Sequence, residues 1–280
     1  MVPRLSAFSA VVVGLLCLAP PLAAQRTKIS VNAVVDAAAS YLVDYQKQFA
    51  FVLADEEYTQ QVLATSVPGP RVRTTTGESF LTFASAIHSW ISVRDVATVD
   101  GVPVPNHEDL RTLLQSGGVP RMEQQIAERN ARYNIGTITR NFNEPTFGLL
   151  VLERRRDDEF KFDVSRVETD GEATLVTLEF KEKGPRTLVH GFNYQPVYST
   201  GAIVVEAGSG RVRQTRLELK YGPVFAQLTT DYAKAPALDM FVPVRFQERY
   251  EQGRGTRHEL IVCDARYSNH RRFEVNVRIR

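Results

Sequence analysis

Apolar and polar residues follow a helical pattern near the start of the chain and an alternating pattern soon after it. Over residues 31–45, apolar side chains recur every three or four positions, which places them on one face of an amphipathic helix. From residue 49 the pattern alternates over residues 49–62, 79–87 and 89–99, as expected of antiparallel strands with one buried face. The pair Asp100-Gly101 is a strong hairpin signal. This part of the chain therefore predicts one helix followed by consecutive strands.

The middle of the chain returns to helical spacing. Asn106, with Asp109 three residues later, resembles a capping box and predicts the start of a helix. A longer helical stretch is predicted over residues 120–133. Pro145 suits the first turn of a third, short helix that extends to Leu152. We expect these segments to form a helical insertion between two sets of strands.

The second half of the chain alternates almost throughout. Turn-forming residues separate the alternating stretches at hairpin spacing, as at Gly222-Pro223 and around Arg254. Several stretches have one polar and one apolar face, which is typical of an antiparallel sheet with one side in water. The predicted strands cover residues 160–167, 173–180, 202–206, 212–221, 224–232, 242–250 and 258–267.

These elements predict an α+β fold in which a large curved antiparallel sheet, an incomplete barrel, packs on the N-terminal helix and a short mid-chain helical insertion. We expect residues 25–280 to form a single domain. Its helix and first strands are predicted in residues 30–105, its helical segment in 106–152 and its mainly antiparallel strands in 159–280.

Residues 1–24 have the three parts of a secretory signal peptide. Arg4 supplies the positive charge, residues 11–19 form an apolar run that is too short to span a bilayer, and small residues precede position 25. We therefore predict cleavage after Ala24 and export to the periplasm or the extracellular space, with no transmembrane segment after cleavage. A lipid anchor on Cys17 is the alternative, but Leu16 stands where such a signal needs a small residue.

Charge and cysteine content narrow the class of protein. The 34 basic and 32 acidic side chains nearly cancel, so nucleic acid is not an expected partner. Cys263 is the one cysteine that remains after the predicted cleavage, so no intrachain disulfide can form. We expect Cys263 to pack as a small apolar side chain in its strand and to be dispensable for folding.

No catalytic, metal or cofactor motif is recognised. His107-Glu108 begins like a zinc-protease motif, but Arg111 stands where the second histidine must be. Ser209 lies between two glycines, yet a nucleophile elbow needs glycines two residues to either side, so this segment predicts a hairpin turn. We therefore predict no catalytic residue, no metal site and no cofactor.

Two clusters of carboxylates are candidates for acid and base chemistry. Asp55-Glu56-Glu57 lies in a predicted strand, where adjacent side chains point to opposite faces. The residues 157–159, Asp-Asp-Glu, follow three arginines and form a self-neutralising boundary. Surface charge is the favoured interpretation of both clusters.

Two polar segments stand out in what is otherwise an apolar pattern. Residues 131–136, with Arg140 soon after, and residues 266–273 mix arginine, tyrosine and asparagine, which are buried only when their hydrogen bonds are satisfied. We expect each segment to form a fixed polar network, as a helix stop and a strand-end turn. In the functional alternative, Arg132, Tyr133, Asn269 and Arg271 line the mouth of a cavity and hold an anionic or polar head group.

At these segments the chain resembles a family of uncharacterised exported bacterial proteins. The resemblance lies in the Tyr-Asn-Ile-Gly segment at residues 133–136 and in the Tyr-Ser-Asn-x-Arg-Arg-Phe segment at residues 267–273. His270 stands where that family usually has an aromatic residue. The family has no established activity. More loosely, a helix followed by long strands resembles the fold of periplasmic lipoprotein carriers, in which a curved sheet wraps helices over an apolar cavity.

Binding is the function that these features favour. Large apolar residues on or beside predicted strands predict an elongated apolar cavity between the N-terminal helix and the concave face of the sheet, with Trp90 nearby. The chain would then be a non-catalytic envelope protein that binds or carries a lipid or other apolar ligand. The alternatives are an interaction module that offers exposed sheet edges to an envelope protein, and a hydrolase whose site is assembled from distant residues.

Overall fold

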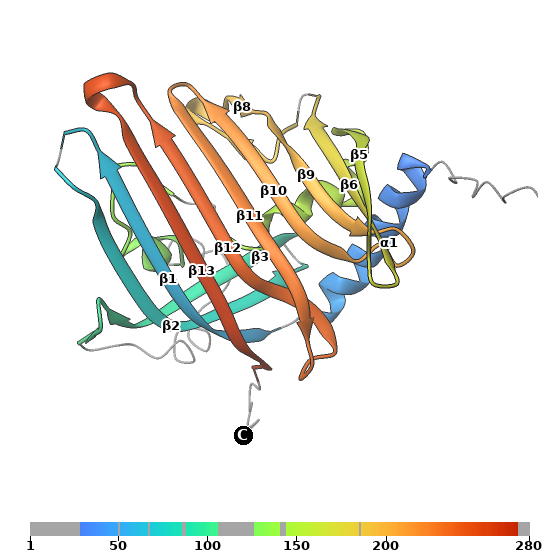
Figure 1. The fold of residues 1–280 in the computed structure, drawn as a ribbon, viewed down its shortest axis with the longest axis horizontal. Coiled ribbons are helices and arrows are strands. Elements are labelled where there is room, and N and C mark those ends of the chain that lie inside the picture. Colours follow the sequence, from blue (N-terminus) through green and yellow to red (C-terminus); the bar gives the residue numbers. More distant parts are fainter. Residues whose placement is uncertain are drawn as a thin grey trace, which may run out of the picture.

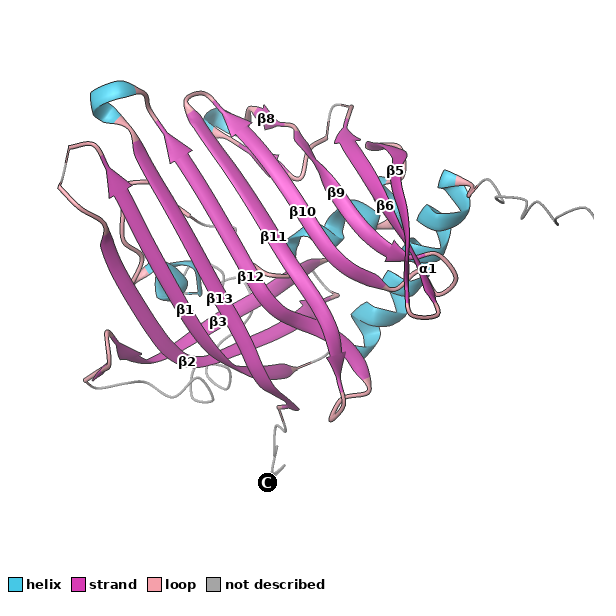
Figure 2. Ribbon diagram, in the orientation of Figure 1, coloured by secondary structure: helices cyan, strands magenta, loops and turns pink. Residues whose placement is uncertain are grey.

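The computed structural model describes residues 29–49, 51–66, 68–85, 88–105, 126–140, 144–184 and 186–273. The predicted signal peptide and the helix start at Asn106 lie outside the described residues. The described residues form one antiparallel sheet of 11 strands with helical segments on one side of it (Figures 1 and 2). We call the side that carries α1 (Val31–Gln48) the inner face and the opposite side the outer face.

The strands follow the order β4-β3-β2-β1-β13-β12-β11-β10-β9-β6-β5, and β4 and β5 are edge strands, so the sheet does not close into a barrel. β2 and β3 run across behind the other strands in Figure 1, which gives the sheet its curvature. A separate two-stranded hairpin, β7-β8, lies beyond β6 in the sequence. The strands are β1 Val52–Ala64, β2 Arg71–Ala84, β3 Ser89–Val99, β4 Val102–Pro103, β5 Phe160–Asp170, β6 Ala173–Glu182, β7 Val189–His190, β8 Pro196–Val197, β9 Ser199–Glu206, β10 Val212–Tyr221, β11 Val224–Ala235, β12 Met240–Gln252 and β13 Glu259–Arg272.

The N-terminal helix forms as its apolar spacing predicts. Ser30 caps it, since the Ser30 hydroxyl accepts a hydrogen bond from the Ala33 backbone nitrogen. Its buried side chains are Val34, Ala38, Ala39, Leu42 and Tyr45. The β9-β10 turn touches the backbone of this helix: a Cβ on Gly210 would lie 2.1 Å from the Ala37 carbonyl oxygen, so only glycine fits there.

Further helical residues occur among the described residues. Residues 126–131 are helical, and η1 (Phe147–Leu152) is a 3-10 helix whose last four residues are buried in the core. The prediction of a short helix opened by Pro145 is thus confirmed in position. Thr230 and Tyr232 donate hydrogen bonds to the Pro145 carbonyl oxygen, which fixes η1 to β11. Three further 3-10 turns are η2 Arg154–Arg156, η3 Phe192–Tyr194 and η4 Gly255–Arg257.

The predicted fold class is confirmed, as an unclosed, curved antiparallel sheet with an N-terminal helix. The strand prediction differs from the structure mainly at β2, which begins at Arg71 and not at residue 79. The added residues are polar or exposed, so they lack the buried alternation that marks a strand in sequence. The β7-β8 hairpin was not predicted, because two-residue strands show no period.

Trp90 lies in a filled part of the core. Its ring packs against Tyr45, Phe49 and Phe83, with ring centroids 5.9, 5.4 and 5.0 Å away, and the side chain is only 2% exposed. The inner face around Trp90 is therefore packed with aromatic rings. Within the described residues, no helix combines the length and the apolar character that crossing a bilayer requires.

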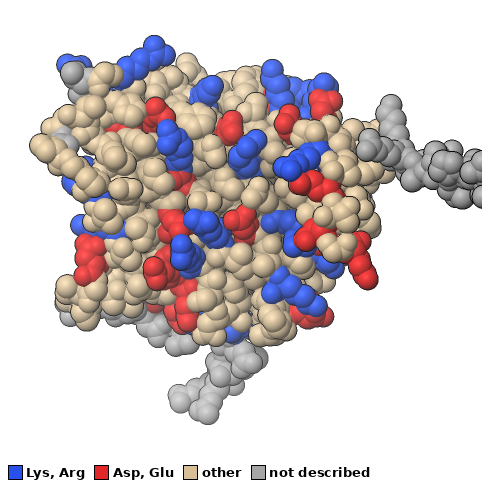
Figure 3. All heavy atoms as spheres, viewed as in Figure 1, with Lys and Arg blue, Asp and Glu red and all other residues tan. Residues whose placement is uncertain are grey.

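Positive and negative side chains are interspersed on the outer face (Figure 3). Arginines on β10, β12 and β13 pair with carboxylates of the same or the neighbouring strand, as Arg245 does with Asp264 at 2.6 Å and Arg249 with Glu251 at 2.8 Å. Such exposed pairs contribute little to stability, about 0–1 kcal/mol each. These charged side chains make the outer face polar, as expected of a sheet surface that is exposed to water.

Candidate functional site: an apolar pocket beside a buried polar network

The inner face is polar where β1, β12 and β13 form it. On β1, the side chains of Glu56, Tyr58 and Gln60 point inward and are at most 6% exposed. Glu248 on β12 and Cys263 on β13 lie on the same face and are 1% exposed each. Because strand side chains alternate, their neighbours Asp55, Glu57 and Asp264 lie on the outer face.

One buried ion pair anchors this region at β3. Arg94 Nε lies 3.0 Å from Glu56 Oε2, and the two side chains are 4% and 5% exposed. The Arg94 guanidinium also lies 4.0 Å from the centre of the Tyr58 ring. The charge of Arg94 is thus balanced by a carboxylate and stacked on an aromatic face, as buried arginines require.

Glu248 joins two tyrosines. The Tyr58 hydroxyl donates to Glu248 Oε1 at 2.8 Å, and the Tyr250 hydroxyl donates to Glu248 Oε2 at 2.6 Å. Burial raises the pKa of both tyrosines well above 10, and the neighbouring Glu248 charge raises it further. Both hydroxyls therefore stay protonated and remain donors.

Arg140 closes the network from the segment that follows residues 126–131. Its Nη1 donates to the Tyr58 hydroxyl at 3.2 Å and to Cys263 Sγ at 2.9 Å, and its Nη2 donates to Gln60 Oε1 at 2.7 Å and to the Ile135 carbonyl at 3.0 Å. The sequence predicts that Cys263 packs among apolar side chains. In the structure it also contacts the guanidinium of Arg140. Burial, and then the charge of Glu248, raise the pKa of its thiol to about 12, so the thiol stays neutral.

This network, formed by Glu56, Tyr58, Gln60, Arg94, Arg140, Glu248, Tyr250 and Cys263, contains two arginines and two carboxylates. Two of its donor atoms, Arg94 Nη1 and Arg140 Nε, have no acceptor among the described residues. Neither pocket described below includes a network residue in its lining. The network therefore holds strands and loop together.

An apolar pocket of about 340 Å³ lies next to the network. Its lining includes residues near the tip of the β10-β11 hairpin, which lies at the upper end of the sheet in Figure 1. Four elements form its walls: residues 137–139, the β7-β8 hairpin, the β10-β11 hairpin and the end of β12. No carboxylate and no cysteine lines it. Its lining is Thr137, Ile138, Thr139, Val189, His190, Gly191, Val197, Leu219, Tyr221, Val224, Ala226 and Gln252.

Polar contacts at its edges hold the walls of this apolar pocket. The Thr137 backbone nitrogen donates to both carboxylate oxygens of Glu259, at 3.1 and 3.2 Å. On the opposite wall, the Phe192 backbone nitrogen donates to the Tyr221 hydroxyl at 2.9 Å. Gly191 is needed there, because a Cβ would lie 2.3 Å from the Tyr221 ring.

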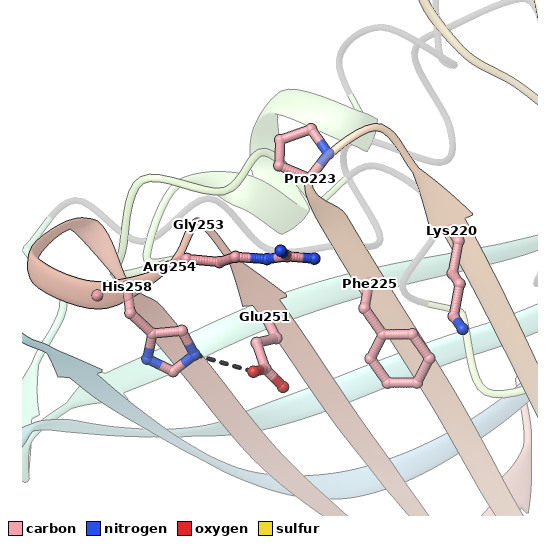
Figure 4. Close-up of a pocket in the computed structure, with 8 residues that line it drawn as sticks. Lys220, Pro223, Phe225, Glu251, Gly253, Arg254 and His258 are labelled. Carbon is pink, nitrogen blue, oxygen red and sulfur yellow. Dashed lines mark hydrogen bonds and ion pairs between the residues drawn. The ribbon is translucent and has the colours of Figure 1, made fainter.

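A second, open pocket of about 580 Å³ lies nearby on the outer face (Figure 4). Lys220 and Phe225 come from the β10-β11 hairpin, and Glu251, Arg254 and His258 come from the β12-β13 hairpin. His258 Nε2 lies 2.9 Å from Glu251 Oε1, and this hydrogen bond, together with that from Arg249, lowers the pKa of Glu251. This second pocket, which we call the polar pocket, thus contains the ionised carboxylate of Glu251 and the basic side chains of Lys220 and Arg254.

The residues predicted to hold a ligand lie in three separate places. Arg132 is exposed beside Tyr133, whose carbonyl accepts a hydrogen bond from Gln60 on the inner face. Asn269 and Arg271 bind Asp55 on the outer face, at 3.1 and 2.8 Å. Neither pair, nor the buried Trp90, lines either pocket. Their binding role therefore stays a prediction.

Local geometry accounts for the two polar segments. Gly136 has a φ of +100°, and a Cβ there would lie 2.4 Å from Ile261 Cδ1, so the Tyr-Asn-Ile-Gly segment requires glycine. Asn269 has a φ of +50° beside the register shift between Leu53 and Asp55, a place where asparagine is tolerated. The expected polar networks exist at both segments, through Gln60 in the first and Asp55 in the second.

The interpretation of two acidic clusters as surface charge is wrong for one residue in each. Glu56 is 6% exposed and pairs with Arg94, and Glu159 is 3% exposed and pairs with Arg156. The signal that identifies such residues is an acid on the apolar side of an alternating strand, as Glu248 is between Phe246 and Tyr250. No strand pattern could have identified Arg140, because it lies in a loop.

No protein-family model and no curated protein sequence matches this chain. Among solved structures, it is similar to a DUF1329 family protein from Desulfovibrio piger, with 11% identity and a TM-score of 0.38 over 89% of this chain and 95% of that one. A putative outer membrane lipoprotein-sorting protein domain from Vibrio parahaemolyticus matches with 8% identity and a TM-score of 0.31, over 88% and 95%. The MucA/MucB complex structure from Pseudomonas aeruginosa matches with 7% identity and a TM-score of 0.23, over 86% and 100%. At these scores none of the similarities bears on function.

Proposed function

We propose that this protein is a non-catalytic binding protein of the cell envelope that holds an apolar group, such as an acyl chain, in the apolar pocket. The observation that supports the proposal is the division of the inner face. Its polar half is closed by Arg140, whereas its apolar half opens at the upper end into a pocket lined by Ile138, Leu219 and Ala226. The pocket is at the small end of the usual range for ligand sites, about 300–1,000 Å³.

A ligand that binds the folded state alone raises the melting temperature by mass action. At a concentration about 100 times its dissociation constant, it stabilises the folded state by about 2.7 kcal/mol. For a chain of this size that corresponds to an increase of roughly 5–10 °C. We expect fatty acids or lysophospholipids to produce such a shift, and an organic extract of the purified protein to contain an apolar molecule.

A pair of neighbouring substitutions makes this test specific. Ala226 lies on β11 and lines the pocket, so Ala226→Leu places a larger side chain inside it. Gln227→Leu adds the same side chain on the outer face of the same strand. We expect Ala226→Leu to abolish the ligand-induced shift and Gln227→Leu to retain it. Equal shifts in both variants, or no shift for any lipid in the unsubstituted protein, would exclude the pocket as the binding site.

The two alternatives have less support. For a hydrolase, the apolar pocket offers His190 as a base but has no carboxylate in its lining to orient it. For strand addition, the long edge strand β5 carries Lys161, Asp163 and Arg166, and charged side chains are a common means of preventing edge pairing. Both observations favour the binding role.

Export remains part of the proposal. Its support is the signal-peptide pattern of residues 1–24, which predicts Gln25 as the first residue of the mature chain. N-terminal sequencing of the protein from the producing cell tests it. Retention of Met1, or a lipid on Cys17, would contradict it.

A further inference from the structure

The upper edge of the sheet in Figure 1 combines exposed aromatic rings with basic side chains. It is formed by the tips of the β10-β11 and β12-β13 hairpins, the end of β6 and the loop between β7 and β8. Both pockets open at this edge, one on each side of the β10-β11 hairpin. We call this edge the rim.

The rim carries the most exposed aromatic side chains of the described chain. Phe192 is 78% and Tyr194 88% exposed, more than any other large apolar side chain among the described residues. Asn193 and Tyr194 have φ angles of 55° and 58°, a conformation that residues other than glycine rarely adopt. The loop is nevertheless fixed at its base, where Phe192 is hydrogen-bonded to Tyr221. The two rings are thus presented to solvent by an ordered loop.

The rim also gathers basic side chains that have no ionic partner. Lys183, Lys220, Arg254 and Arg257 are exposed, and none of them forms an ion pair with a described residue. Elsewhere on the outer face, arginines are paired with carboxylates, as Arg245 is with Asp264. In Figure 4 the Arg254 guanidinium extends over the open polar pocket and not toward a carboxylate.

We propose that the rim is a docking surface for an anionic phospholipid bilayer. Aromatic rings favour the interfacial region of a bilayer, where their apolar body and polar edge are both satisfied. Unpaired lysines and arginines nearby are attracted to anionic headgroups. The combination of exposed rings, unpaired cations and an adjacent apolar pocket fits a lipid surface better than an acidic protein, which would not require the rings. The proposal does not depend on what the apolar pocket holds.

Sedimentation with vesicles tests this surface. The protein should bind vesicles of phosphatidylglycerol mixed with phosphatidylcholine, and salt should weaken the binding because it screens exposed charges. The variant Lys220→Ala/Arg254→Ala/Arg257→Ala should bind roughly 100-fold more weakly, at about fivefold per cation removed. A control variant, Lys47→Ala/Arg166→Ala/Lys234→Ala, removes three exposed cations elsewhere and should bind almost as the unsubstituted protein does.

The aromatic contribution is tested separately. Phe192→Ser/Tyr194→Ser should weaken binding to the same vesicles, whereas Val102→Ser/Val167→Ser, which changes exposed apolar side chains away from the rim, should not. Circular dichroism and the melting temperature verify that each variant is folded. Equal binding by the rim and control variants would overturn the proposal. Absence of binding to anionic vesicles at low salt would also overturn it, in favour of an acidic protein partner.

Discussion

The inner face has two halves that are buried to the same extent by different chemistry. Under α1, strands β6, β9, β10 and β11 present Leu178, Ile203, Leu217 and Leu228, all at most 4% exposed. Under Arg94 and Arg140, β1, β12 and β13 present carboxylates and tyrosines that are equally buried. The apolar half needs only shape complementarity, whereas each group of the polar half needs a specific partner. Substitutions should therefore be tolerated differently in the two halves.

The largest effect is expected from breaking the buried ion pair of the polar half. Arg94→Met leaves the Glu56 carboxylate buried without its partner, which should lower the free energy of unfolding by about 3–5 kcal/mol. Replacing both residues, as in Arg94→Met/Glu56→Leu, should restore most of that loss, because no uncompensated charge remains. Urea denaturation of the three proteins measures this. A double variant as unstable as the single one would show that the pair itself, and not the unpaired charge, sets the stability.

A comparable substitution in the apolar half should cost somewhat less. Leu217→Ala removes a side chain that is 1% exposed and leaves a cavity, at a cost of about 3 kcal/mol. Glu218→Ala, at the next position but on the outer face, removes one partner of the ion pair with Arg216 and should change stability by less than about 1 kcal/mol. Denaturant titration compares the two. Similar losses for both would contradict the assignment of inner and outer faces on β10.

A buried carboxyl beside η1 should give the protein a pH dependence. Glu144 lies between Arg140 and η1, and burial raises the pKa of its carboxyl to about 8 from 4.5. The folded protein thus holds this proton more tightly than the unfolded chain does. Its contribution to stability is complete below about pH 4.5 and is lost as the pH rises through 8.

The variant Glu144→Gln isolates this contribution from those of other groups. The melting temperature of the unsubstituted protein should fall more between pH 5 and pH 9 than that of the variant. The two proteins should differ least at the acidic end. Parallel curves across the range would mean that Glu144 does not titrate differently in the folded and unfolded states.

A small effect is expected at Cys263, although it lies in the polar half. The variant Cys263→Ala removes one acceptor of Arg140 Nη1, which keeps the Tyr58 hydroxyl as a partner, so the cost should be about 1 kcal/mol. Because burial holds the pKa of the thiol at about 12, thiol reagents should not modify the folded protein at neutral pH. Labelling with and without denaturant tests this. Rapid labelling of the folded protein would show that the polar half opens to solvent.

The sequence predicted the apolar half better than the polar half. Alternation on β10 and the turn at Gly222-Pro223 are local features, and the structure has both. Alternation also placed Glu56 on the face opposite to its neighbours in sequence. It could not show that Glu56 forms an ion pair with Arg94, which lies 38 positions later on β3, with β2 between the two strands. Arg140 reaches the network from a loop that has no period at all. The candidate pocket depends on the β7-β8 hairpin, whose strands are too short to leave a pattern.

The strand order has a consequence for how the chain folds. β13, the last of the described strands, lies between β1 and β12, and the residues that β1 and β13 pair are about 200 positions apart, as Tyr58 and Ala265 are. Until β13 is in place, β1 to β4 form one sheet and the strands from β5 to β12 form another. β1 is then an unpaired edge of the first sheet, and β12 is an unpaired edge of the second. Long-range pairing of this kind folds slowly, because the entropy of closing the loop is lost before the contacts form. A chain that lacks residues 259–273 should therefore fail to fold and should aggregate, because the two separate sheets cannot be joined without β13.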